Sequence, residues 1–496
     1  MLDRDIQVLT HAIAVLEWDQ ETYMPELGIE ERAEQLALLK GILHQNITSS
    51  EIGELLDRLG ADTNNPEGNR SLGIRDRAII REVFRRYKIN TNLPASLIKR
   101  LARQTSITQS RWVQAKNQSD FGLFAPYLEQ LLSLILEKAE KLGYKESLYD
   151  PLLDEYEPWM KTSELEAILL PLQDQLIRIL EQIIHSNRTI DSSVMGRSLS
   201  LKIQRDFNTE LLLSMGYDFK KGRLDESAHP FTTTLGRADI RLTTRYKSDR
   251  FASSIFSTIH EGGHGLYEMG FDEELQWTVL AEGASLGIHE SQSRMWENLI
   301  GRSLPFWKYF YPRLKSRTKS VLSDVSLENF YKSINKVEPS LIRVEADEVT
   351  YNLHIILRFN LEKRLICQGL RVKDLPEAWN EESKKLLGLC PERDAEGVLQ
   401  DIHWSMGAFG YFPTYSLGNL YAAQIYSAMK AENSSLDREI ERGRLSTVLG
   451  WLRDRIHRHG KTYPAGDLCR QVTGERLNAD YFIRYLYDKF KLIYGF

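Results

Sequence analysis

The sequence DIRLTTRYKSDRFASSIFSTIHEGGHGLYEM, residues 239–269, contains two different hydrophobic patterns, one after the other. Over residues 239–246 the side chains Ile240, Leu242, Thr244 and Tyr246 alternate with charged or polar ones, which predicts a strand with one buried face. From residue 251 onward, apolar residues recur every three or four positions, which predicts a helix over about 253–269 packed beneath the strand. We therefore expect a small sheet at this strand, with the helix beneath it.

Outside that stretch most of the sequence is typical of amphipathic helices. Leu128, Leu131, Leu132 and Ile135, for example, recur at helical spacing with charged residues among them. Polar, turn-rich segments at 60–71, 185–200 and 220–228 are expected to be surface loops. The sequence therefore predicts a mainly α, single-domain fold with a small β-sheet beside the helix at 253–269.

Composition and charge exclude several classes of function. The 496 residues carry 64 Lys and Arg against 69 Asp and Glu, with no basic cluster, so nucleic-acid binding is not expected. The 3 cysteines offer no disulfide framework and fit a reducing compartment. The start at Met1 lacks the pattern of a signal peptide, and no apolar stretch is long enough for a membrane span. A cytoplasmic enzyme is the expectation.

A metal-binding motif lies inside the predicted helix at 253–269. His260 and His264 are one turn apart on one face, so both imidazoles can reach a single zinc ion, as in the motif HExxH. Glu261 lies next to the first ligand, where its carboxylate can take a proton from a water molecule that the metal activates. The pattern predicts a hydrolytic zinc site with one ion per chain, and cobalt could substitute because such a site binds several divalent metals.

The third protein ligand is open on spacing alone. The glutamates downstream of the motif are Glu268, Glu282, Glu290 and Glu297. Glu268 would lie a turn beyond the metal, whereas Glu282 and Glu290 can both return on a second, antiparallel helix. Asp239 and Asp347 are candidates for orienting the ligand imidazoles, as zinc histidines need. Spacing does not separate these alternatives.

Motifs along nearly the whole chain resemble the M32 metallocarboxypeptidases, the carboxypeptidase Taq family. The matching segments are 16–25 (LEWDQETYMP), 149–158 (YDPLLDEYEP), 229–231 (HPF), 239–243 (DIRLT), the zinc helix, 289–293 (HESQS), 342–351 (IRVEADEVTY), 397–404 (GVLQDIHW), 410–415 (GYFPTY), 473–474 (TG) and 481–486 (YFIRYL). Trp159 and Gly265 depart from the family pattern and leave the ligand residues untouched.

The resemblance implies more than the spacing does. It favours Glu290 as the third zinc ligand, and it implies a homodimer of 496-residue chains with a deep central cleft. Within the single domain, residues up to about 220 would form a helical part covering the cleft, and about 221–496 would hold the zinc site and bind substrate. The activity implied is zinc-dependent removal of residues from the free C-terminus of peptides.

Residues for handling a peptide's C-terminus are also predicted. A planar arginine fork suits a terminal carboxylate, and Arg343 is the first candidate, with Arg241 a weaker one. For Arg343 the alternative is an intrahelical ion pair with Asp347. His403, Tyr411 and Tyr415 are candidate donors to the oxyanion of the tetrahedral intermediate, and their alternative is simple packing.

Two other functions compete with the carboxypeptidase hypothesis. A zinc oligoendopeptidase would share the motif, and cleavage of peptides with an amidated C-terminus would distinguish it. A helical binding scaffold with a vestigial metal site is disfavoured by the intact Glu261. The metal chemistry follows from the residues themselves, whereas the exopeptidase assignment follows from the resemblance.

Overall fold

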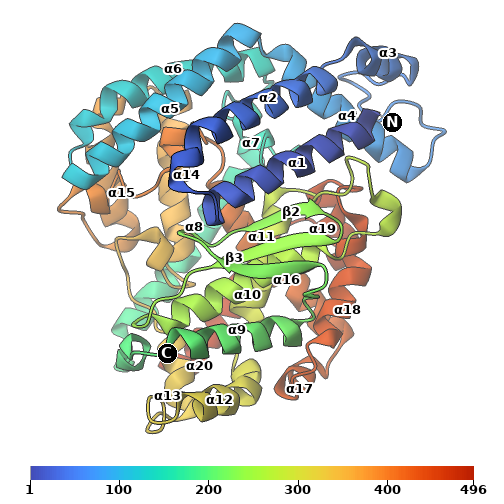
Figure 1. Ribbon diagram of the computed structural model, residues 1–496. Coiled ribbons are helices and arrows are strands. Elements are labelled where there is room, and N and C mark those ends of the chain that lie inside the picture. The colour runs from blue at the N-terminus through green and yellow to red at the C-terminus, as the bar shows by residue number, and fades with distance from the viewer. Residues whose placement is uncertain (1) are drawn as a thin grey trace. The chain divides into compact units, whose positions relative to one another are not determined.

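The computed structural model describes residues 2–496, so Met1, which opens the segment examined for a signal peptide, lies outside it. Helices predominate, and a single three-stranded sheet accompanies them in the described residues (Figure 1). This confirms the predicted mainly helical fold with a small sheet. No helix between residues 2 and 496 is both long enough and apolar enough to cross a membrane.

The chain packs into two compact units, each built from three separate segments. Unit 1 comprises Met1–Thr91, Ile190–Ile334 and Tyr421–Leu477, and unit 2 comprises Asn92–Thr189, Asn335–Leu420 and Asn478–Phe496. These units do not follow the boundary predicted near residue 220, because each draws on both halves of the sequence. The organisation as one domain with two functional parts stays a prediction.

Unit 1 holds the sheet and the helices around it. Its helices are α1 (Leu2–Thr22), α2 (Ile29–Ile47), α3 (Ser50–Arg58), α4 (Ile74–Asn92), α9 (Leu201–Met215), α10 (Phe251–Glu268), α11 (Leu286–Arg294), α12 (Leu304–Thr318), α13 (Leu327–Ile334), α17 (Leu436–Glu441), α18 (Ser446–Arg455) and α19 (Ala465–Thr473). The strands are β1 (Gly222–Glu226), β2 (Thr232–Gly236) and β3 (Asp239–Thr244). A single turn of π-helix, Met295–Ile300, continues α11.

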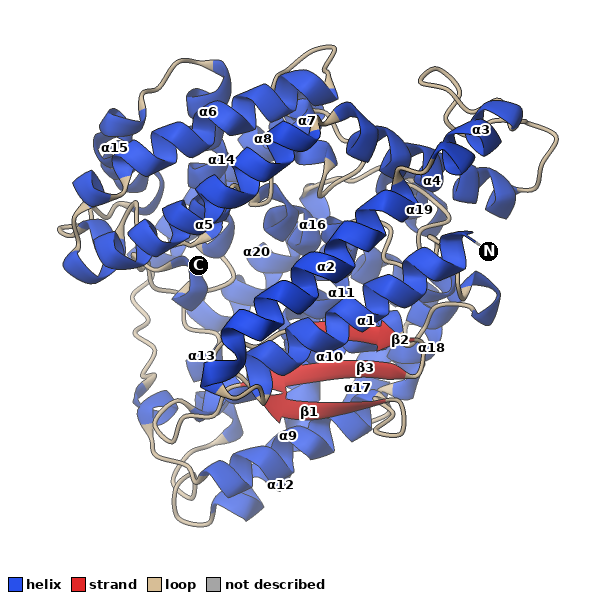
Figure 2. Ribbon diagram, turned by 45° about the horizontal axis from the view of Figure 1, so that its top comes forward, coloured by secondary structure: helices blue, strands red, loops and turns tan. Residues whose placement is uncertain are grey.

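The sheet has the order β1-β3-β2, with β3 in the middle (Figure 2). β1 runs parallel to β3, pairing Gly222 with Ile240, and β2 runs antiparallel, pairing Thr232 with Leu242. The predicted strand at 239–246 is confirmed, two residues shorter. The predicted loop at 220–228 is wrong, because residues 222–226 form strand β1. The sequence did not indicate this strand, since Leu224 is its one apolar side chain and its pairing with β3 stabilises it.

Helix α10 lies against one face of this sheet and carries the metal-binding motif. Ile240 and Leu242 of β3 are completely buried, as are Ile259 and Leu266 of α10. α9 and α11 pack against α10 as well, and α1 packs on β2. The helix predicted at 253–269 is therefore confirmed and begins two residues earlier, surrounded by elements of unit 1.

Unit 2 is helical. Its helices are α5 (Ala95–Gln118), α6 (Ala125–Leu142), α7 (Asp150–Asp154), α8 (Thr162–His185), α14 (Tyr351–Cys367), α15 (Leu375–Leu387) and α20 (Asp480–Tyr494), and α16 (Pro413–Glu432) begins in unit 2 and ends in unit 1. α14 packs against α8 and α15, and most of its side chains are buried. Its partly exposed polar residues, Asn360, Lys363 and Arg364, lie on one face, so the charged residues elsewhere on the helix must find partners inside unit 2.

Candidate metal centre

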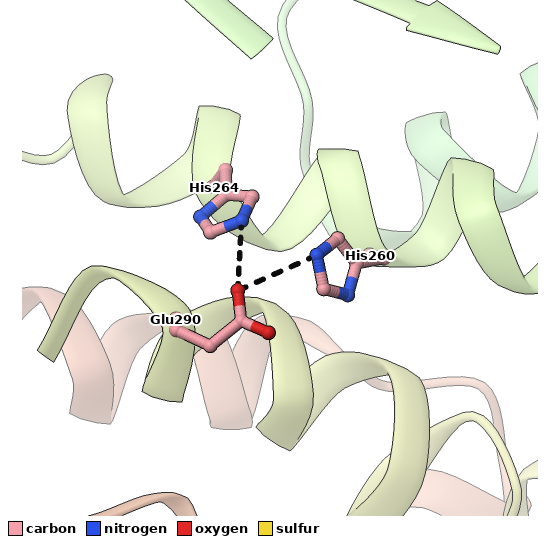
Figure 3. Close-up of side chains that lie close together, drawn as sticks. All are labelled: His260, His264 and Glu290. Atoms are coloured by element: carbon pink, nitrogen blue, oxygen red, sulfur yellow. Dashed lines mark ion pairs between the residues drawn. The ribbon is translucent and has the colours of Figure 1, made fainter. Parts of the chain in front are cut away.

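The two histidines of α10 and a carboxylate of α11 form a compact group. His260, His264 and Glu290 each offer one ligand atom, and these atoms all lie within 4.8 Å of one another. The Oε2 atom of Glu290 is 3.6 Å from Nε2 of His260 and 3.4 Å from Nε2 of His264 (Figure 3). It is the one such group of three that the described residues contain.

The rival third ligand, Glu282, is occupied elsewhere in unit 1. Its Oε1 accepts a hydrogen bond from Nη2 of Arg86 at 2.5 Å, and its Oε2 accepts one from Nζ of Lys461 at 3.1 Å. Burial alone would raise the pKa of Glu282, but Arg86 and Lys461 hold it well below its usual range. Geometry therefore favours Glu290, and its role as a metal ligand stays a prediction.

Three glycines let neighbouring elements approach α10 closely around the two histidines. A Cβ at Gly263 would lie 2.7 Å from the Cα of Ser293 in α11, and one at Gly262 would lie 2.6 Å from a methyl group of Leu212 in α9. A Cβ at Gly265 would lie 2.9 Å from Leu242 in β3. The cost of glycine in a helix is thus explained by close packing on three sides.

The far nitrogen of each imidazole is held by a second residue. Nδ1 of His260 lies 2.9 Å from Oε2 of Glu297, and Nδ1 of His264 lies 2.6 Å from Nδ1 of His289. Nε2 of His289 lies 2.7 Å from Oε1 of Glu268. Because an ionised carboxylate only accepts, His289 donates its Nε2–H to Glu268 and accepts at Nδ1 from His264. Both ligand histidines then direct the Nε2 lone pair toward Glu290.

These partners are not the ones that the sequence suggested. Asp239 accepts two hydrogen bonds from Arg241, and Asp347 accepts hydrogen bonds from the backbone of Val349 and Thr350, so neither orients a ligand imidazole. Glu297 and His289 were missed in this role. The sequence could have indicated Glu297, because it follows Glu290 by seven residues, or two helical turns, and so lies on the same helix face.

The charge of the cluster suits a divalent cation. Nε of Arg294 donates to Oε1 of Glu290 at 2.6 Å, and Oγ of Ser293 donates to its Oε2 at 3.1 Å. Burial alone would raise the pKa of Glu290, but the guanidinium of Arg294 holds it well below its usual range. Burial lowers the pKa of His264 to about 3, so this imidazole is neutral at pH 7. Two imidazole nitrogens and one ionised carboxylate are a donor set that fits zinc.

Glu261 points its carboxylate to the sheet side of α10. Oγ1 of Thr232, in β2, donates to Oε2 of Glu261 at 2.6 Å, and the Glu261 side chain is buried. Burial raises the pKa of Glu261 above its usual value. A carboxylate with a raised pKa beside the metal motif is suited to accept and return a proton.

A second cluster of charge lies within unit 2. Arg343, in the short 3₁₀ helix Arg343–Glu345, donates from Nε and Nη2 to Oδ1 of Asp401 at 3.1 and 2.8 Å, and from Nη1 to the hydroxyl of Tyr351 at 3.0 Å. Arg358 of α14 donates to Oδ2 of Asp401 at 2.7 Å. The alternative of an intrahelical ion pair between Arg343 and Asp347 is wrong, because Arg343 bonds Asp401 instead.

The candidate oxyanion donors lie in this same cluster. Nε2 of His403 is 3.3 Å from the hydroxyl of Tyr415, the rings of His403 and Tyr411 are 5.3 Å apart, and the guanidinium of Arg343 is 4.9 Å from the ring centre of Tyr415. Burial lowers the pKa of His403 to about 4. The imidazole is therefore neutral at pH 7 and able to donate one N–H. The structure brings four of the sequence-predicted residues together in unit 2.

Arg241 does not belong to that cluster. Its Nε and Nη2 donate to the two oxygens of Asp239 at 2.8 and 2.7 Å, and its guanidinium stacks 4.1 Å from the ring centre of Trp18. The two N–H groups of Arg241 that could bind a substrate carboxylate thus already donate to Asp239 of unit 1. Its substrate role stays a prediction.

Comparison with known proteins supports the same chemistry. The family model described as "Carboxypeptidase Taq (M32) metallopeptidase" matches residues 1–490. Thermostable carboxypeptidase 1 of Thermus thermophilus is 43% identical, over 99% of this chain and 97% of the relative. Carboxypeptidase 1 of Bacillus subtilis is 40% identical, over 98% of this chain and 96% of the relative.

Solved structures match along the full length as well. The M32 carboxypeptidase from Deinococcus radiodurans R1 superposes with a TM-score of 0.94 at 34% identity, covering 100% of this chain and 98% of that one. A Pyrococcus furiosus carboxypeptidase superposes with a TM-score of 0.94 at 38% identity, covering 99% of this chain and 97% of that one. Sequence, fold and metal motif agree, and the chain belongs to the carboxypeptidase Taq (M32) family of metallopeptidases, which makes it a metallocarboxypeptidase.

Proposed function

We propose that this metallocarboxypeptidase binds one zinc ion through His260, His264 and Glu290, and releases the last residue of peptides with Glu261 as general base and acid. The observation that carries the proposal is the convergence of the two Nε2 atoms and Glu290 Oε2 within 4.8 Å, with the far side of each ligand held by another residue. Three protein ligands leave one coordination position open, which catalytic zinc sites need.

When bound, zinc supplies a Lewis acid that lowers the pKa of a water molecule and polarises the scissile carbonyl. Glu261 takes the proton of that water and passes it to the leaving amine. Thr232 holds one oxygen of Glu261 at 2.6 Å, which fixes the direction of the carboxylate during both transfers. These steps need no residue outside unit 1.

For the substrate's end we propose Arg343 as the partner of the terminal carboxylate. Within the described chain, three of its five N–H donors are used by Asp401 and Tyr351, so donors are left for an anion. His403, Tyr411 or Tyr415 would stabilise the oxyanion, and neutral His403 has a buried Nδ1 without a protein partner. Arg241 is a weaker candidate because Asp239 already fills its fork.

A peptide digest read by mass spectrometry tests the activity. Metal-free enzyme, and the same enzyme restored with zinc or cobalt, would each receive one peptide with a free C-terminus and its C-terminal amide. Stepwise loss of C-terminal residues from the free peptide, only with metal, is the expected result. Equal cleavage of the amide at internal bonds would instead establish an oligoendopeptidase, and no cleavage at all by the zinc-loaded enzyme would establish a binding scaffold.

A homodimer and a cytoplasmic location are part of the same proposal. The dimer rests on resemblance to the family, and the location rests on the few cysteines of the sequence, which fit a reducing compartment. Sedimentation equilibrium would give about twice the chain mass of 57.4 kDa for a dimer. A mass of a single chain at micromolar concentration would contradict it.

A further inference from the structure

One buried carboxylate of unit 2 has no part in the chemistry above. Glu362 of α14 is completely buried. Its Oε2 accepts hydrogen bonds from the hydroxyl of Tyr149 at 2.6 Å and from the backbone N–H of Gly410 at 3.0 Å, and its Oε1 accepts one from Nε1 of Trp404 at 2.8 Å. Two segments that are distant from α14 in the sequence, one at Tyr149 and one at 404–410, thus meet on one side chain.

Two of these donors directly flank the candidate oxyanion donors. Trp404 follows His403, and Gly410 precedes Tyr411, so Glu362 holds both ends of the segment 403–411. We call residues 402–412 the donor segment. A shift of its anchor points would move His403 and Tyr411 with it.

The donor segment is also tightly packed where Glu362 binds it. Gly410 has a φ of +87°, and a Cβ there would lie 2.5 Å from the backbone oxygen of Leu152 in α7. Trp404 and Tyr149 are buried, and the side chain of Tyr149 comes from the residue just before α7. Glu362, α7 and the donor segment therefore form one packed core.

Only an acceptor fits this position. Tyr149, Trp404 and Gly410 all donate, and a carboxylate accepts at both oxygens, whereas a glutamine would present an NH₂ group to at least one donor. Burial raises the pKa of Glu362 to about 7, while Tyr149, Gly410, Trp404 and Arg358 act in the opposite direction. Burying a carboxylate is expensive, so a role in ordering the donor segment against Tyr149 is a reason for its presence.

We propose that Glu362 is a positioning residue that fixes the donor segment, and with it His403 and Tyr411, for the carboxypeptidase reaction. This inference rests on the proposed function for its catalytic consequence, and on the hydrogen bonds alone for its structural part. Truly catalytic groups would touch the substrate, whereas Glu362 acts through the segment it holds.

The test compares Glu362→Gln with Glu166→Gln. Glu166 of α8 pairs with Lys363, the next residue of α14, so the control also removes a carboxylate that contacts α14 but none that contacts the donor segment. For Glu362→Gln we expect kcat to fall about tenfold to 100-fold, KM to change less than about threefold, and zinc content to stay at wild-type level. Hydrogen–deuterium exchange of peptides within 402–412 should quicken. Glu166→Gln should match the wild type in all four readouts.

Tyr149→Phe is a second, less disruptive variant that keeps the test possible if Glu362→Gln does not fold. It removes one donor and leaves the other two, so a smaller fall in kcat with the same faster exchange is expected. Wild-type exchange in 402–412 or an unchanged kcat in both variants would overturn the inference. If the zinc-loaded wild type releases no C-terminal residues, the proposed function fails by itself, and the exchange data still decide whether Glu362 orders the segment.

Discussion

The metal cluster of unit 1 and the arginine cluster of unit 2 are both buried groups of charge, but they are balanced in opposite directions. Around His260 and His264, four glutamates (Glu261, Glu268, Glu290 and Glu297) face two arginines, Arg294 and Arg302. Around Asp401, two arginines share one carboxylate. The first cluster has an excess of negative charge and the second an excess of positive charge.

That difference assigns a kind of partner to each cluster. Buried charge is costly unless it is paired, so an excess of one sign within a protein predicts a ligand of the other sign. The cluster of unit 1 therefore favours a cation, and the cluster of unit 2 favours an anion such as a peptide's terminal carboxylate. Variants that change one cluster and leave the other intact test this contrast.

The largest expected effect comes from Glu261→Gln. Loss of the general base should lower kcat/KM about 100-fold to 10,000-fold with zinc content unchanged, because glutamine cannot accept the proton. Glu273→Gln, on an exposed glutamate of the same unit, is the control and should keep wild-type activity. More than a tenth of wild-type activity in Glu261→Gln would refute the role of Glu261.

The second-largest effect is expected for Arg343→Ala, which removes one arginine of the cluster around Asp401. Asp401 would keep its hydrogen bond from Arg358 but lose the one from Arg343 to its other oxygen, so the free energy of unfolding should fall by about 3 kcal/mol. KM should rise, because Arg343 is the proposed partner of the substrate's terminal carboxylate. Arg371→Ala removes the exposed pair with Asp374 in the same unit and should cost less than about 1 kcal/mol. Urea unfolding and steady-state kinetics measure both, and equal losses in the two variants would contradict the account.

His289→Gln tests how the metal ligand is oriented. Without the acceptor at Nδ1, His264 loses the bond that fixes its ring, so the dissociation constant for zinc should rise about tenfold to 100-fold. A competing chelator with a colour change measures this constant. His185→Gln, at an exposed histidine, should leave it unchanged. If His289→Gln bound zinc as tightly as the wild type, the orienting role of His289 would be wrong.

The smallest effect is expected for glycine replacements. Gly263→Ala should lower the free energy of unfolding by about 1 to 3 kcal/mol, because its Cβ would press on the backbone of α11. Gly450→Ala in α18 meets nothing within 4 Å and should raise it by about 0.5 to 1 kcal/mol, since alanine favours helix. Effects of the same sign would show that close packing around α10 is not what requires Gly263.

Local patterns in the sequence sufficed for the helix and strand of the metal motif. His260 and His264 are four residues apart, so helical periodicity alone places them on one face. Glu290 could not be distinguished from Glu282 in this way, because the distinction depends on Arg86 and Lys461, which are distant in sequence. The two candidate ligands on α10 could therefore be predicted from local spacing, whereas the candidate on α11 depends on contacts between residues that are far apart in the sequence.

Strand β1 and the role of Glu362 were not predicted for the same reason, because both depend on contacts between residues that are distant in the sequence. β1 has too few apolar residues to be recognised and exists through its pairing with β3. In the sequence Glu362 precedes Lys363 and Arg364 and has the pattern of a surface carboxylate, and only the structure shows Tyr149, Trp404 and Gly410 around it. Hydrogen-bond partners separated by tens or hundreds of residues leave no periodic signal.

Anomalous diffraction above and below the zinc absorption edge tests the central claim most directly. From crystals of zinc-restored enzyme we predict one strong peak per chain, at about 2.0–2.2 Å from Nε2 of His260, Nε2 of His264 and an oxygen of Glu290. No other protein ligand should contact the ion. A peak elsewhere, a fourth protein ligand closing the site, or no peak between these three residues would contradict the account.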